Sequence, residues 1–206
     1  MLADHAVLEV RERDTRRVAR AKDVTDVGLL ARMADGDTLA MQAFYARHNV
    51  RVFRFVLRII SDHSLAEDVI SEVFLDVWRQ SGRFEGRSAV STWLLAIARH
   101  KAYAVLRKRR VEFTKDEVSE DIEDAADTPD ATHEKGARSE LLRRCLNDLT
   151  PIHREIIDLV YYHEKSVAEV ATICDIPENT VKTRLFYARK RLATLAREAG
   201  IDREWL

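Results

Sequence analysis

Residues 166–200, SVAEVATICDIPENTVKTRLFYARKRLATLAREAG, decide the fold of the C-terminal part of this chain. Ser166 followed by Glu169 has the form of a capping box, in which each side chain bonds the other residue's backbone N–H, and it predicts a short helix. A turn follows, and Pro177 starts a long helix that ends near Gly200. A short helix, a tight turn and a long second helix predict a helix–turn–helix domain.

The long helix carries an apolar stripe and a basic face. Val181, Leu185, Ala188, Leu192 and Leu195 recur at helical spacing, so we expect this stripe to face the core. From residue 181 to residue 197 there are six cations and no carboxylate, a pattern typical of binding to duplex DNA. A charged helix that binds a partner protein is the alternative interpretation. The candidate DNA-binding residues are Asn179, Thr180, Lys182, Thr183, Arg184, Phe186, Tyr187, Arg189 and Lys190.

The remaining patterns predict an all-α protein of two small helical domains joined by an acidic flexible linker. Only six Gly and three Pro occur among 206 residues, and apolar residues recur at helical spacing. Helices are expected at 26–34, 38–60, 64–80, 91–110, 137–148 and 151–163, with a capping box opening the third at Ser64 and with Ile152, Ile156, Leu159 and Val160 buried in the last. The expected parts are an N-terminal extension (1–24), a first domain (25–110), the linker (111–136), the helix–turn–helix domain (137–200) and a tail (201–206).

Charge is sorted into blocks although the net charge is only −1. Residues 86–111 hold seven cations and no carboxylate, beside a loop that carries Phe84, Arg87 and Ser88. Such a cationic track with aromatic side chains suits unpaired bases, which offer stacking faces. Residues 112–134 hold ten acidic residues and one Lys, which predicts an extended, flexible linker.

Several classes of function are disfavoured by the sequence. No apolar run is long enough to span a membrane, and the charged N-terminus lacks the apolar segment of a secretory signal. Cys145 and Cys174 lack metal-ligand spacing, and we expect them to be buried, reduced thiols in a cytoplasmic protein. No nucleophile–base set is evident, so we expect neither an enzyme nor a cofactor or metal.

Ordered motifs give the chain a resemblance to a known family. They are AEDVISEVFLDVW (66–78), STWLLAIAR (91–99), LTP (149–151) and PENTVKTRLFYARKRL (177–192). With these motifs, residues 26–197 resemble a bacterial RNA polymerase sigma factor of the extracytoplasmic-function (ECF) group.

The resemblance implies a role for each group of candidate residues. Those implied to dock on core RNA polymerase are Asp68, Ser71, Glu72 and Leu75. Those implied to recognise and melt the −10 promoter element are Phe84, Arg87, Ser88, Arg99, His100, Lys101, Arg107 and Lys108. The C-terminal helix would read the −35 element, and the acidic linker would pass through channels of the core enzyme.

The partners implied are core RNA polymerase, promoter DNA and an anti-sigma factor, with no membrane and no small-molecule substrate. Promoter elements separated by roughly 20 base pairs lie on the order of 70 Å apart along B-DNA, a distance that a linker of this length does not span as a relaxed coil. We therefore expect the core enzyme to stretch the linker.

Five positions depart from the family pattern. Ser71 stands where Gln is usual, His100 where Asn is frequent, Ala104 where Asp is frequent, Asn179 where Gly is common and Tyr187 where Arg is common. These differences predict altered polymerase contacts and unusual promoter preferences. Two other functions fit parts of the sequence: a sigma mimic that sequesters an anti-sigma factor, and a plain helix–turn–helix regulator.

Overall fold

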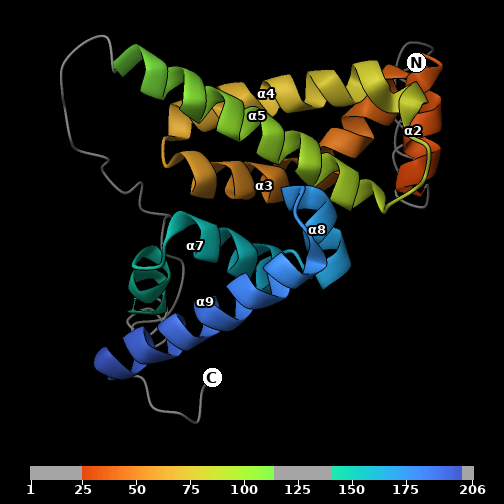
Figure 1. The fold of residues 1–206 in the computed structure, drawn as a ribbon. Helices are drawn as coiled ribbons and strands as arrows, with labels where there is room; N and C mark the ends of the chain where they lie inside the picture. Colours follow the sequence, from red (N-terminus) through yellow and green to blue (C-terminus); the bar gives the residue numbers. More distant parts are fainter. Residues whose placement is uncertain (1–24, 114–140, 201–206) are drawn as a thin grey trace, which may run out of the picture.

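The computed structural model describes residues 25–113 and 141–200, and the regular secondary structure of these residues is entirely helical (Figure 1). The all-α prediction is therefore confirmed for these residues. The N-terminal extension, nearly all of the acidic linker, the start of the helix expected at 137 and the C-terminal tail lie outside the described residues.

The first helical unit comprises α2 (Asp26–Ala34), α3 (Thr38–Ile60), α4 (His63–Gln80), the short 3₁₀ helix η1 (Ser81–Arg83) and α5 (Val90–Phe113). The bounds of α2 and α3 are those predicted. α3 begins where it does because the Asp37 carboxylate accepts hydrogen bonds from the backbone N–H groups of Leu39 and Ala40. α5 continues three residues beyond its predicted end.

The capping box predicted at Ser64 is wrong. Asp62 is the N-cap of α4, and its side chain accepts a hydrogen bond from the Leu65 backbone N–H, which places Ser64 inside the helix. A carboxylate is at least as good a cap as a hydroxyl, so the helix begins one residue earlier than expected. Arg109 of α5 pairs with the same carboxylate at 3.1 Å.

The second helical unit comprises residues 141–147, α7 (Pro151–Ile157), the π-helix η2 (Asp158–Tyr162), α8 (Val167–Cys174) and α9 (Glu178–Glu198). The capping box of α8 is confirmed, with both reciprocal hydrogen bonds between Ser166 and Glu169 present. Gly200 follows α9 with φ +79°, as expected of a residue just past a helix end. α8, its turn and α9 confirm the helix–turn–helix.

One expectation for α7 fails. Thr150 is the N-cap of the helix, and its side chain makes no capping hydrogen bond. Ile152 is 47% exposed rather than buried, because it lies with Pro151 in the exposed first turn and burial begins only at Glu155. Ile156 and Leu159 are fully buried as predicted.

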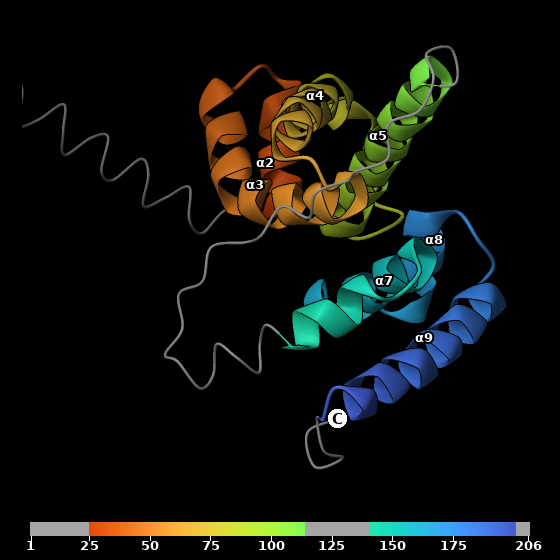
Figure 2. The same ribbon diagram turned by 90° about the vertical axis from the view of Figure 1, so that its left-hand side faces the viewer.

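The two helical units pack directly against each other. α8 contacts α5, and α7 contacts α3, so the second unit lies beneath the first in Figure 1 and again in the turned view of Figure 2. The buried apolar residues of both units form one continuous cluster. The sequence patterns predict two modules on a linker and do not predict this contact.

Candidate nucleic-acid interface

The exposed face of α9 is the clearest candidate for binding DNA. Val181 and Ala188 are fully buried against the core, which turns the opposite side of the helix outward. There Phe186 is 63% exposed and Tyr187 is 53% exposed, with their rings 5.4 Å apart at 77°. Burying large aromatic side chains is favourable, so an exposed pair among cations points to a binding partner. The other predicted residues on this face are also exposed, except Thr180 and Arg184, which are half-buried.

Tyr161 belongs to the same surface and is not among the residues predicted from the sequence. It lies in η2, is exposed, and its hydroxyl accepts a hydrogen bond of 2.7 Å from Nε of Arg189. The Arg189 guanidinium also lies 5.5 Å from the Tyr161 ring centroid. Tyr161 therefore positions one of the predicted DNA-binding cations and widens the aromatic surface.

The loop before α5 has a different character. The ring of Phe84 lies 5.3 Å from that of Trp93, and both side chains are half-buried against the core. Gly86 adopts φ +70°, a conformation that few other residues tolerate. Beyond this turn Arg87 is exposed and pairs with Glu85 at 2.7 Å. The loop thus offers a cation beside a partly open aromatic pair.

The predicted −10 residues of α5 do not share one surface. His100, Arg107 and Lys108 are exposed, whereas Arg99 faces the second helical unit and contacts Glu155. Lys101 faces α4 and pairs with Asp76 of that helix. The sequence grouped all five because they are close along the chain, but neighbouring positions on a helix point in different directions.

Lys101 is held by two carboxylates of α4. Its ammonium lies 2.9 Å from Asp76 and 3.2 Å from Glu72. The hydrogen bond to Asp76 is the main cause that raises the pKa of Lys101, with Glu72 adding to it against the opposing effect of burial. A residue predicted to contact DNA is thereby joined to Glu72, one predicted to contact the polymerase.

The four predicted polymerase-binding residues share one exposed face of α4. Asp68, Ser71 and Leu75 follow one another at intervals of three and four positions, Glu72 is adjacent to Ser71, and all four are exposed. Leu75 is 46% exposed, so this face presents an apolar side chain among carboxylates. The Ser71 hydroxyl donates a hydrogen bond to the Glu67 backbone carbonyl.

Both cysteines are buried, as predicted, and neither is in a disulfide. Burial raises the pKa of Cys174 to about 12, and burial also raises the pKa of Cys145. A thiol with so high a pKa holds almost no thiolate at neutral pH, which disfavours a reactive redox role. Among residues 25–113 and 141–200 no group of three His, Cys, Asp or Glu is placed to hold a metal ion. No helix in the same residues combines the length and apolarity needed to span a membrane.

Comparison with known proteins matches both helical units. Residues 44–112 match the family described as Sigma-70 region 2, and residues 139–192 match Sigma-70, region 4. Over 172 residues the chain is 31% identical to the ECF RNA polymerase sigma factor SigL of Mycobacterium tuberculosis, covering 82% of this chain and 96% of SigL. The chain belongs to the ECF RNA polymerase sigma factors.

Other ECF sigma factors show similar agreement. SigK of Mycobacterium bovis is 29% identical over 171 residues, covering 80% of this chain and 89% of SigK. Among solved structures, the sigma factor RpoE of Bartonella quintana, in complex with the anti-sigma factor NepR, aligns with a TM-score of 0.63 at 26% identity, covering 74% of this chain and 94% of RpoE. CnrH, in complex with the cytosolic domain of CnrY, shares the fold with a TM-score of 0.61 at 24% identity, over 84% of this chain and 97% of CnrH.

Proposed function

We propose that this ECF sigma factor binds core RNA polymerase through the exposed face of α4, recognises and melts the −10 element with the loop at Arg87 and α5, and reads the −35 element with α9. It acts as a non-enzymatic specificity subunit. The observation that carries the proposal is the exposed pair Phe186 and Tyr187, set among cations on the second helix of a helix–turn–helix.

Reading of the −35 element divides between two kinds of side chain. Phe186 and Tyr187 are suited to apolar contact with thymine methyl groups in the major groove. Lys182 and Lys190 are exposed on the same helix and suit phosphate oxygens, which fix position without reading sequence. Tyr161, from η2, extends the aromatic surface.

Recognition of the −10 element requires bases that are unpaired. The half-buried rings of Phe84 and Trp93 supply an aromatic wall on which an extruded base can stack. Arg87 lies three residues from Phe84 and is exposed to reach the neighbouring phosphate. Of the α5 candidates, His100, Arg107 and Lys108 are accessible to DNA in the arrangement described, and Arg99 becomes accessible only if the second unit moves.

The proposed partners are core RNA polymerase, promoter DNA and an anti-sigma factor. The last is supported by RpoE, which aligns over most of its length and was solved with the anti-sigma factor NepR. The polymerase contact is supported by the exposed Leu75 among the carboxylates of α4.

Transcription in vitro tests the function. Purified core RNA polymerase and this chain should give promoter-specific products from a promoter library, which core enzyme alone does not give. Leu75→Lys should abolish the product and the binding to core enzyme. Leu39→Lys is the matched control, because Leu39 is 41% exposed on α3 and lies outside the proposed surface. Binding to an anti-sigma factor without any affinity for core enzyme would instead indicate a sigma mimic.

A further inference from the structure

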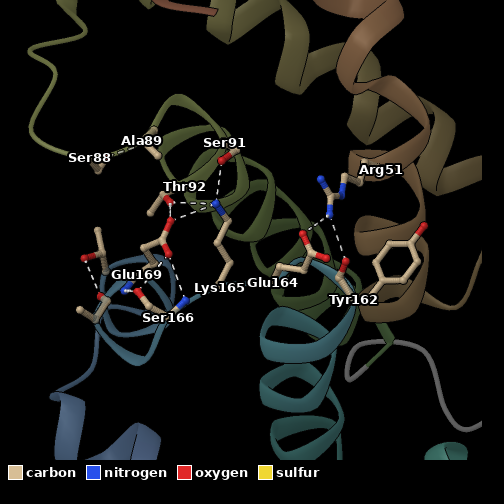
Figure 3. Close-up of polar contacts among 12 residues, drawn as sticks. Arg51, Ser88, Ala89, Ser91, Thr92, Tyr162, Glu164, Lys165, Ser166 and Glu169 are labelled. Atoms are coloured by element: carbon tan, nitrogen blue, oxygen red, sulfur yellow. Dashed lines mark hydrogen bonds and ion pairs between the residues drawn. The ribbon is translucent and has the colours of Figure 1, made fainter.

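The contact between the two helical units is built from specific polar pairs as well as apolar packing. Figure 3 shows one part of it, in which side chains of the second unit reach α5 and Arg51 of α3 reaches the second unit. A contact formed only by nonspecific apolar packing would leave such polar groups in water, because burying polar groups without partners is costly.

Arg99 and Glu155 form the central pair. Nε of Arg99 donates to Oε1 of Glu155 at 2.8 Å, and Nη2 donates to Oε2 at 3.3 Å. The Glu155 side chain is only 3% exposed and that of Arg99 is 23% exposed. The Arg99 guanidinium also lies 4.7 Å from the ring centroid of Tyr103. Both oxygens of a buried carboxylate therefore occupy the fork of donors that would otherwise be available to a phosphate.

A second network lies at the N-terminal end of α5. Nζ of Lys165 donates to the hydroxyl oxygens of Ser91 at 2.6 Å and Thr92 at 3.1 Å, and it pairs with Glu169 at 3.1 Å (Figure 3). The Thr92 hydroxyl donates in turn to Glu169 at 2.6 Å. Burial alone would raise the pKa of Glu169, but hydrogen bonds from Thr92, the Ser166 backbone and Lys165 lower that pKa to about 2. Glu169 is therefore ionised at neutral pH.

Arginines of α3 complete the contact. Arg51 and Arg54 donate to the backbone oxygen and the hydroxyl of Tyr162, at 3.2 and 2.8 Å. Arg58 pairs with Asp158, whose side chain is 4% exposed. The π-helix η2 brings Asp158 and Tyr162 to this side of the second unit. The units thus meet through matched charges along both α3 and α5.

We propose that these contacts form an autoinhibitory latch, consisting of Ser91, Thr92 and Arg99 on the first unit and Glu155, Lys165 and Glu169 on the second. The latch keeps Arg99 away from DNA and holds regions 2 and 4 together until the polymerase and promoter separate them. This inference rests on the proposed function, since it assigns Arg99 to the DNA-binding surface.

The chemistry of the latch suits release by a polyanion. A DNA phosphate offers Arg99 the same bidentate geometry as the Glu155 carboxylate, and once the units part Glu155 regains water. The latch is an intramolecular contact, so binding of an external ligand must offset the free energy of that contact before Arg99 becomes accessible. The apparent affinity of such a protein for DNA is the affinity of the open form multiplied by the fraction of molecules that are open.

Two variants that change the net charge in opposite directions test the latch. Glu155→Gln removes a negative charge and Lys165→Met removes a positive charge, yet each deletes one contact between the units. Binding of the full chain to a fluorescent single-stranded DNA oligonucleotide should tighten about tenfold for both variants. Asp35→Asn is the matched control, because Asp35 is an exposed carboxylate in the turn between α2 and α3. If the two variants move affinity in opposite directions, only net charge is at work and the latch is refuted.

A reversible tether tests whether opening is required for transcription. Arg51 and Glu164 lie on opposite units with their charged groups 3.9 Å apart, and their side chains are 51% and 83% exposed. Arg51→Cys with Glu164→Cys, joined by a bis-maleimide that has a reducible centre, should lose promoter-specific transcription and regain it on reduction. The buried native cysteines leave the introduced pair as the accessible thiols among the described residues.

The outcomes separate the latch from the function that underlies it. Absence of promoter-specific transcription by the wild-type chain would refute the proposed function. Transcription by wild type that the closed tether leaves unchanged would refute the latch alone. Loss with the tether, recovery on reduction and tighter DNA binding by both latch variants would support the latch.

Discussion

Replacing the Arg99–Glu155 pair by apolar side chains tests the contact between the two helical units without the use of DNA. Arg99→Met alone leaves a carboxylate that is 3% exposed without its partner, and Glu155→Leu alone leaves Arg99 facing an apolar group. Breaking one partner of a buried pair typically costs about 3–5 kcal/mol, whereas replacing both partners by packed apolar residues is close to neutral. The double variant should therefore regain the closed arrangement that each single variant loses.

The size of the loss is limited by the fold. In each single variant the units can part, which lets water hydrate the remaining charge, so the loss of stability cannot exceed the free energy of closing. We therefore expect a coupling energy between Arg99 and Glu155 of about 2–3 kcal/mol. That coupling corresponds to a shift of roughly 30- to 150-fold in the closing equilibrium.

Energy transfer between two dyes measures closing directly. Dyes at Val50→Cys on α3 and Thr172→Cys on α8 use positions that are exposed on the first and second units. Both single variants should show a longer mean distance, and the double variant should return toward wild type. If the free energy of closing lost by the double variant equals the sum of the losses in the two single variants, the reasoning is refuted, because Arg99 and Glu155 would then show no coupling.

Three further predictions concern other parts of the chain. Burial and the nearby Arg51, Arg58 and Lys165 lower the pKa of His163 from 6.5 to about 4, and the adjacent Asp158 is paired with Arg58. The unfolded chain then binds a proton that the folded chain does not, so stability should fall as pH drops from about 6.5 to about 4, and His163→Gln should flatten this fall in Tm. Ser166→Ala should cost about 1 kcal/mol in denaturant unfolding by removing the cap of α8, while Thr172→Ala on the exposed side of that helix should cost less than about 0.5 kcal/mol. Tyr187→Ala should change the order of preference among −35 variants, whereas Lys190→Ala should weaken binding to all of them and reduce the salt slope by about 1; equal effects of both on every variant would contradict the assignment of the α9 face.

Local structure was well predicted from the sequence because local signals determine it. The apolar spacing of α9 predicted which side is buried, and Ser166 with Glu169 predicted the start of α8. At α4 two residues competed to cap the helix, and the pattern alone did not show that Asp62 would do so rather than Ser64. The exposed face with Phe186 followed directly from the buried stripe.

The contact between the units was not predicted, because it depends on docking of segments that are far apart in sequence. Arg99 and Glu155 are 56 positions apart, and nothing in the spacing of either helix shows that they meet. A signal was nevertheless present. Glu155 and Asp158 lie beside Ile156 and Leu159 in an otherwise apolar stretch, and carboxylates on a buried face require partners. The arginines of α3, at positions 51, 54 and 58, supply matching charges at helical spacing.

The shared apolar cluster has a consequence for evolution and engineering. Since residues of both halves pack into one cluster and Arg99 finds its partner in the other half, the halves have to change in concert. A chimera that joins region 2 of this chain to region 4 of a distant homologue would keep each proposed DNA-reading surface yet inherit mismatched charges between the two regions. Such hybrids should therefore differ from both parents in basal activity even where promoter preference transfers intact.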